Sequence, residues 1–168
     1  LFIGGSWLER LGRTSGTKWA ANGRKWLENR AIRLMGEDGS FSQYSLNYHR
    51  VMLDTFSTVE VWRRQLSSPE FSTRLLQRVK AAAHWQYAMT NRWNGDGPNL
   101  GANDGARLLQ ITNTHYRDFR PSVQLASVLF AGARAYPDEG EWDQPLRWLG
   151  LASPKVALPD PKSEVFDQ

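Results

Sequence analysis

The chain has 168 residues, of which 40% are hydrophobic, 23% charged and 12% aromatic, and it contains eight Trp and no Cys. This length and composition fit one globular domain or part of a larger one, and they exclude an intrinsically disordered chain. The lack of cysteine excludes a disulfide scaffold, a zinc ribbon and a thiol nucleophile. The longest uncharged stretch, residues 121–133, is too short for a membrane-spanning helix, which needs about 20 residues.

The charge balance is basic, with 21 Lys and Arg against 17 Asp and Glu and a net charge of +4. Five of these 21 residues are Lys, so 21 − 5 = 16 are Arg. Because the planar guanidinium group matches carboxylate, sulfate and phosphate, the composition favours an anionic partner, either an acidic polysaccharide or a nucleic acid. The arginines are scattered through every segment instead of following one helix face, which makes nucleic-acid binding the less favoured alternative.

Hydrophobic periodicity predicts helices in the first half of the chain. The first predicted helix covers residues 17–35, with Thr17 as its N-cap. The second begins at Ser42 or Ser45 and ends near Leu66. The connections between these segments are short, so we expect neighbouring helices to run antiparallel.

The third helix is predicted to open at Ser68 and Pro69, as N-cap and first helical residue, and to end near Met89. Residues 91–105 are too rich in Gly and Pro to form a regular helix. Weak helical character returns over residues 106–111.

A buried helix is predicted over residues 121–135, which are apolar on nearly every side, and a short helix is expected after Pro145. No alternating strand pattern precedes residue 155. The predicted fold class is therefore all-α. Residues 164–166 look like the start of a strand after a Pro-rich linker, so we expect the native protein to continue.

Residues 44–50 concentrate hydrogen-bonding side chains at the start of the second predicted helix. Asn47 and Arg50 are three residues apart and share a helix face. Tyr48 and His49 are about 100° apart around the helix, so the two cannot both be in the core. One interpretation is a functional site formed by these four residues. The alternative is that Asn47 caps the helix, Tyr48 packs inside, and His49 and Arg50 are solvated.

Residues 95–107 form a second unusual segment, with the sequence GDGPNLGANDGAR. It lacks the Gly-Lys-Ser/Thr of a phosphate-binding loop and the acid spacing of an EF-hand. Long non-periodic loops often line a site, so Asn99, Asn103 and Asp104 are candidate ligand-binding residues, and Trp93 is a candidate platform for a sugar ring. The alternatives are an ordinary interhelical connection or, less favoured, a calcium site. We predict no metal site and no cofactor.

Three blocks of this sequence resemble the heparinase II/III-like polysaccharide lyases: Glu-Asp-Gly-Ser-Phe at residues 37–41, Ser-Leu-Asn-Tyr-His-Arg at 45–50, and Pro-Asn-Leu-Gly-Ala-Asn-Asp-Gly at 98–105. The likeness extends from about Trp19 to the end of the chain. It implies an incomplete (α/α) toroid of antiparallel helical hairpins over residues 1–152, then a linker at residues 153–168 leading into a β-sandwich domain beyond the chain.

The resemblance implies β-elimination on an acidic polysaccharide or oligosaccharide that contains uronic acid, in the periplasm or outside the cell. It assigns Asn47 and Arg50 to the substrate carboxylate, and Tyr48 and His49 to proton transfer. By the family's spacing a further catalytic tyrosine would fall within residues 101–104, where this sequence has none.

The family's second histidine comes from the β-sandwich, so we expect the 168 residues alone to be inactive. A non-catalytic glycan-binding or processing scaffold on the same fold remains the alternative. Either interpretation requires the polar segment at residues 44–50 and the glycine-rich loop to face each other across an open groove.

Overall fold

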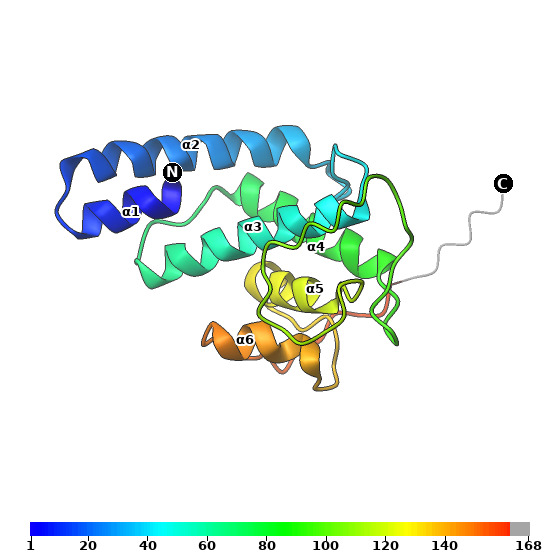
Figure 1. Ribbon diagram of the computed structural model, residues 1–168. Helices are drawn as coiled ribbons and strands as arrows, with labels where there is room; N and C mark the ends of the chain where they lie inside the picture. The colour runs from blue at the N-terminus through cyan, green and yellow to red at the C-terminus, as the bar shows by residue number, and fades with distance from the viewer. Residues whose placement is uncertain (162–168) are drawn as a thin grey trace.

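The computed structural model describes residues 1–161, and over that range the chain is helical, which confirms the all-α prediction (Figure 1). Two isolated β-bridges, Met35 with Phe41 and Arg134 with Ala157, are the only extended pairings within these residues. The helices are α1 (Phe2–Arg10), α2 (Thr14–Leu34), α3 (Leu46–Gln65), α4 (Thr73–Met89), α5 (Arg120–Ala126) and α6 (Gln144–Trp148). None of them is long and apolar enough to cross a bilayer.

Helices α1 and α2 form a tight antiparallel hairpin whose contact depends on glycine (Figure 1). A Cβ atom added at Gly5 would lie 2.2 Å from the backbone nitrogen of Ala20, and one added at Gly23 would lie 2.2 Å from the nitrogen of Phe2. Gly16 meets α1 in the same way. The two backbones therefore touch directly, at positions where any larger residue would push them apart.

Helix α2 begins at Thr14, and not at Thr17 as predicted. Thr17 lies in the first turn, where its hydroxyl donates a hydrogen bond to Oε1 of Glu9 in α1 over 2.9 Å. The sequence pattern before residue 17 is only weakly periodic, and the pairing with α1 extends the helix by a turn. Helix α1 itself was not predicted.

Helix α4 begins at Thr73 with Ser72 as its N-cap, so the predicted start at Ser68-Pro69 is wrong. The Ser72 hydroxyl accepts a hydrogen bond from the backbone N–H of Leu75 over 3.2 Å. Helix α2 holds the preceding residues extended, because the Arg24 guanidinium donates to the carbonyl of Glu70 (2.7 Å) and the carboxylate of Glu28 accepts from the N–H of Ser72 (2.8 Å). Tertiary contacts thus override a favourable local start signal.

Helix α3 is the central element and buries residues along most of its length. One hydrophobic cluster joins it to α1, α2 and α4, and includes Phe2, Ala31, Leu53, Phe56 and Leu75. A second cluster lies on its other side, under α5 and α6, and consists of Val61, Leu125, Val128, Leu129 and Leu146. This packing fixes α3 from two sides, which gives the residues at its N-terminus a rigid base.

Two of the three helices predicted after residue 105 form, and one does not. The segment predicted at residues 121–135 forms α5, which continues as a π-helical turn over Ser127–Ala131 and ends at Gly132 with φ +66°. A short 3₁₀ turn, Glu141–Asp143, leads into α6 after Gly140. The weak helix predicted at residues 106–111 does not form.

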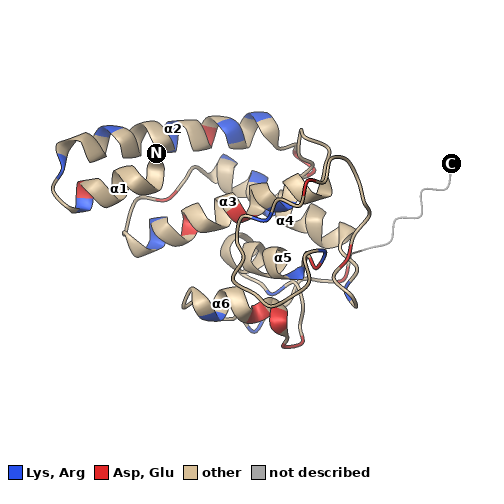
Figure 2. Cartoon of the chain, viewed as in Figure 1, with Lys and Arg blue, Asp and Glu red and all other residues tan. Residues whose placement is uncertain are grey.

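Residues 153–161, predicted as part of a linker, contain no helix and fold back onto the helical part. The N–H of Arg134 donates to the carbonyl of Val156 over 2.8 Å, and the N–H of Leu158 donates to the carbonyl of Arg134 over 2.7 Å. The strand-like segment predicted at residues 164–166 lies outside the described residues. Lys and Arg residues are spread over the helices, whereas several acidic residues lie close together along the chain where it enters α6 (Figure 2).

Candidate functional site

Helix α3 has Ser45, one of the two predicted starts, as its N-cap. The Ser45 backbone is extended (φ −136°), and the Ser45 hydroxyl accepts a hydrogen bond from the N–H of Tyr48 over 3.1 Å. This start turns Asn47, His49 and Arg50 inward, where each is at most 2% exposed, and leaves Tyr48 half-buried at the surface. As predicted, one of Tyr48 and His49 faces the core and the other faces the surface. The buried residue is His49, whereas the alternative in the sequence analysis had Tyr48 packed inside and His49 solvated.

His49 is sealed inside the protein. Its Nε2 lies 2.9 Å from the carbonyl oxygen of Gly39, its Nδ1 lies 2.5 Å from Oε1 of Gln86, and its ring stacks on Trp85 at 4.6 Å. Burial lowers the pKa of His49, and the contacts with Gly39 and Gln86 offset this only in part. An imidazole with both nitrogens engaged and no exposed surface cannot reach a substrate, so in this conformation His49 positions its neighbours.

The contact between His49 and Gly39 joins two of the blocks that carry the family resemblance, residues 37–41 and 45–50. Gly39 has φ +90°, and a Cβ there would lie 2.2 Å from the carbonyl oxygen of Ala81 in α4. Only glycine can adopt this backbone conformation in so little space. The Gly36–Ser40 turn, α3 and α4 are therefore locked together around the His49 ring.

Arg50 is fully buried and ties the loop to α3. Its guanidinium donates to Oδ1 of Asn47 (2.5 Å), to the carbonyl of Tyr116 (2.5 Å) and to the carbonyl of Ala106 (3.1 Å). It also lies over the rings of Tyr116 (4.6 Å) and Phe119 (4.7 Å). Arg50, predicted to bind the substrate, is buried and holds both ends of residues 106–116, where no helix forms.

The glycine-rich loop contacts the start of α3 directly, whereas the sequence analysis expected the two segments to face each other across an open groove. The N–H of Leu46 donates to the carbonyl of Leu100 over 3.1 Å, and the Ser45 hydroxyl donates to the carbonyl of Ala102 over 2.5 Å. Gly101 has φ +70°, and a Cβ there would lie 2.0 Å from the carbonyl oxygen of Tyr44. The loop thus packs closely over the N-terminus of α3.

The outer face of this contact carries a polar surface that we call the ledge, formed by Tyr48, Asn99, Asn103, Asp104 and Tyr116. The Tyr48 hydroxyl donates to Oδ2 of Asp104 over 2.5 Å, and the Tyr116 hydroxyl donates to Oδ1 of Asn103. The Asn103 amide approaches Oδ1 of Asn99 at 3.4 Å. The three loop residues are exposed and both tyrosines are half-buried. Two phenols therefore stand next to adjacent residues of one loop.

The Tyr48–Asp104 hydrogen bond shifts both groups. It raises the pKa of the Tyr48 phenol above its ordinary value of 10.0, because the negative charge of Asp104 disfavours a phenolate. The same bond lowers the pKa of Asp104 below 3.8. At neutral pH the pair consists of a protonated phenol and a carboxylate, so Tyr48 holds a proton and Asp104 is charged.

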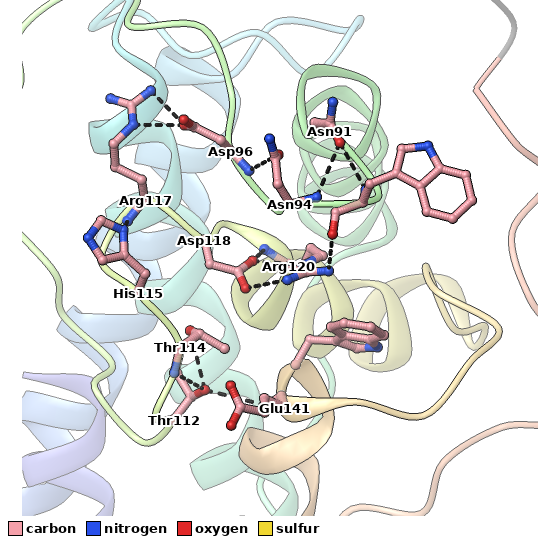
Figure 3. Close-up of polar contacts among 12 residues, drawn as sticks. Asn91, Asn94, Asp96, Thr112, Thr114, His115, Arg117, Asp118, Arg120 and Glu141 are labelled. Carbon is pink, nitrogen blue, oxygen red and sulfur yellow. Dashed lines mark hydrogen bonds and ion pairs between the residues drawn. The ribbon is translucent and has the colours of Figure 1, made fainter.

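The remainder of the loop is fastened by ion pairs (Figure 3). The Arg117 guanidinium contacts Oδ1 of Asp96 in the loop at 2.6 Å, while Arg120 pairs with Asp118 at 2.8 Å next to the loop. Trp93 is 80% exposed, and the Arg92 guanidinium lies over its ring, 5.1 Å from the centroid. Among the hydrogen bonds of residues 1–161, none connects Trp93 to the ledge, so this predicted platform is not brought together with the other candidates.

Asp54 is a buried ionisable residue that the sequence analysis missed, one turn after Arg50 on the same helix face. It is 1% exposed, and burial raises its pKa to about 6, with Ser122 and the nearby Arg50 offsetting part of the effect. The spacing of four residues between Arg50 and Asp54 was the available signal, because such pairs lie on one face of a helix.

We expect Asp54 to make the protein less stable as the pH rises. The folded-state pKa of about 6 lies above the ordinary 3.8, so the folded protein holds the extra proton and loses that advantage between those two values. Relative to Asp54→Asn, the wild-type free energy of unfolding should fall by about 2–3 kcal/mol between pH 4 and pH 7.5. Urea denaturation at both pH values measures this. The exposed Asp138→Asn is the control, and parallel pH profiles for wild type and Asp54→Asn would contradict the expectation.

Among residues 1–161, no group of three His, Cys, Asp or Glu side chains is placed to hold a metal ion. Comparisons of the chain with protein-family models, with curated proteins and with solved structures found no match. The site must therefore be interpreted from its own geometry, in which the ledge is the accessible part and His49, Asn47 and Arg50 form its support.

Proposed function

We propose that this chain is a helical domain of a polysaccharide lyase that cleaves a uronic-acid-containing glycan by β-elimination, outside the cytoplasm. Residues 44–50 and the glycine-rich loop are in contact and do not face each other across the expected groove, so the proposal places the substrate on the outer face of that contact. The observation that carries the proposal is the ledge on this face, where two phenols, a carboxylate and two amides lie together on an accessible surface. The family resemblance and the arginine-rich composition support an acidic glycan as substrate. The antiparallel α1–α2 hairpin is consistent with the proposed incomplete toroid.

β-Elimination needs a base to remove the C5 proton of the uronic acid and an acid to protonate the leaving glycosidic oxygen. As the C4–O bond breaks, the electron pair of the C5–H bond becomes the C4–C5 double bond. Tyr48, kept protonated by Asp104, is our candidate for the acid. Tyr116, the other phenol of the ledge, is the candidate for the base and takes the place of the tyrosine missing from residues 101–104. It must first release to solvent the hydroxyl proton that it donates to Asn103, and the resulting phenolate then takes up the C5 proton.

The buried residues then act through the ledge. Arg50 donates hydrogen bonds to the backbone carbonyl of Tyr116 and to the side chain of Asn47, and so holds both in place. His49 holds the start of α3 against α4 through its contact with Gln86. This role differs from the sequence-based assignment, in which these three residues contact the substrate or move a proton. Positioned donors and acceptors of this kind contribute rate because they need no reorganisation during the reaction.

Tyr48→Phe should lower the turnover of uronate polymers by about 10²- to 10⁴-fold, since general acid catalysis typically contributes that much. The assay uses the native gene product that contains these residues, with alginate, heparin and heparan sulfate, and follows the ultraviolet absorbance of the unsaturated product. Tyr44→Phe is a matched control because Tyr44 is 78% exposed and lies four residues away. Equal activity of Tyr48→Phe and wild type would remove Tyr48 from the mechanism.

The burial of His49 favours one second candidate, a non-catalytic glycan-binding scaffold on the same fold. The two candidates separate in a single experiment, in which glycan binding and product formation are measured on the same preparation. A scaffold binds a uronate polymer without forming unsaturated product, and its affinity falls when Asn103 and Asp104 are replaced by alanine. A lyase forms the product.

A further inference from the structure

A second concave surface lies away from the ledge, between loop residues 110–113 and the outer side of α6. It has a volume of about 750 Å³ and is lined on the α6 side by Gln144, Arg147 and Trp148. This volume is within the usual range for ligand sites, about 300–1,000 Å³. The Trp148 side chain is 76% exposed at its edge, which is unusual for an indole, because indoles are mostly buried in folded proteins.

The walls of this cavity are held in place from behind and from the side. On the inner face of α6, Leu146 is 2% exposed and packs with Val61 and Leu125. Oε1 of Gln144 accepts a hydrogen bond from the N–H of Asn113 over 2.8 Å, which joins the loop wall to the helix wall. A ligand would therefore bind to a preformed surface, and little free energy would be lost in ordering its side chains and loop.

The loop wall has its own support. The Thr112 hydroxyl lies 3.3 Å from that of Thr114 and 3.4 Å from the carbonyl oxygen of Glu141, just before α6 (Figure 3). The Arg107 guanidinium donates to the carbonyl of Thr114 over 3.2 Å. The backbone that presents Gln110 and Asn113 is thus fixed at both ends, although it has no regular secondary structure.

The groups that line the cavity are those that bind a sugar acid. Among the hydrogen bonds of residues 1–161, none engages the side-chain amides of Gln110 or Asn113. The closest acidic partner of Arg147 is Glu139, at 3.9 Å, and no acidic side chain lines the cavity. The lining therefore carries one positive charge and free amide groups beside a flat apolar ring. A pyranose with a carboxylate offers the complementary set, namely an apolar ring face, hydroxyls and one negative charge.

We propose that this cavity is a second binding site for a uronic-acid-containing oligosaccharide, with Trp148 stacking on a sugar ring and Arg147 binding its carboxylate. The inference rests on the proposed function for its class of ligand, but it concerns residues that the ledge does not share. A glycan long enough to reach both surfaces would gain affinity, because the second contact becomes intramolecular. Long oligosaccharides should consequently depend on Trp148 more than short ones do.

The test uses the chain labelled with fluorotryptophan, titrated with alginate, heparin and polygalacturonate oligosaccharides, with neutral dextran as the reference. The Trp148 fluorine signal, identified by its loss in Trp148→Phe, should shift with at least one uronate and not with dextran. Trp148→Ala and Arg147→Gln should each raise the Kd of that uronate about 3- to 10-fold. Trp19→Ala, which removes a tryptophan of similar type on α2 (47% exposed), should leave the Kd unchanged.

The proposal is overturned if the Trp148 signal stays in place with every uronate, or if dextran moves it equally. It is also overturned if Trp19→Ala weakens binding as much as Trp148→Ala does. These results are separable from those on the ledge. Loss of turnover in Tyr48→Phe with a static Trp148 signal removes only the second site, whereas a responsive Trp148 in a protein that forms no unsaturated product removes only the lyase reaction.

Discussion

Replacing Arg50 with alanine should lower the free energy of unfolding by about 3–5 kcal/mol at pH 8, because several hydrogen bonds from a buried charged group are lost and their acceptors are left unpaired. The guanidinium is fully buried and makes three hydrogen bonds, to Asn47, Ala106 and Tyr116. Its removal also takes away one of the two positive charges, Arg50 and Arg107, that lower the pKa of the buried Asp54. Urea denaturation followed by far-ultraviolet circular dichroism measures the change.

The control for this prediction is Arg33→Ala, which removes an exposed arginine near the end of α2. It should change the stability by no more than about 0.5 kcal/mol. Arg50→Lys is expected to fall between the two, because an ammonium group keeps the charge but cannot span two carbonyls in the plane of a guanidinium. Equal stability of Arg50→Ala and Arg33→Ala would show that Arg50 does not hold the loop.

Gly5→Ala should destabilise the protein by about 1–3 kcal/mol, while Gly4→Ala should stabilise it by about 0.5–1 kcal/mol. The two glycines are neighbours in α1 and have the same intrinsic cost in a helix. A Cβ at Gly5 would lie 2.2 Å from the backbone of α2, which cannot give way without separating the helices, whereas a Cβ at Gly4 meets nothing within 4 Å. The pair isolates the helix contact from helix propensity.

Thermal unfolding of the two variants on one preparation decides this prediction, because the expected shifts in Tm have opposite signs. A fall in Tm for both variants would mean that α1 does not tolerate alanine for reasons other than its approach to α2. A rise for both would mean that the two backbones are not in contact in solution. A crystal structure or nuclear Overhauser contacts between residues 2 and 23 provide the independent check.

Local signals predicted the elements whose ends are set by their own residues. Ser45 caps α3 as expected, and the Gly- and Pro-rich residues 91–105 form no helix. The start of α4 was misplaced because Arg24 and Glu28 of another helix hold residues 69–72 extended. A single sequence contains no signal for such long-range hydrogen bonds, although it contains the Ser-Pro pair that misled the prediction.

The candidate site shows the same division. Helical spacing predicts that Tyr48 and His49 point in different directions, but which of them faces the core depends on where α4 and the loop lie. Residues 44–50 and the glycine-rich loop were predicted to face each other across an open groove, but they are in direct contact. The roles of the residues in that contact were not predictable, because the burial of His49 depends on Gly39, Trp85 and Gln86.

The attachment of Arg50 to two distant carbonyls has a consequence for how the protein opens locally. Ala106 and Tyr116 are held by one side chain, so the intervening segment should exchange its amide hydrogens as one cooperative unit together with the first turns of α3. Tyr116 would leave the ledge in that opening, and its hydrogen bond to Asn103 would break. On heating, the ledge should therefore lose its native arrangement at a temperature below that at which the protein unfolds globally.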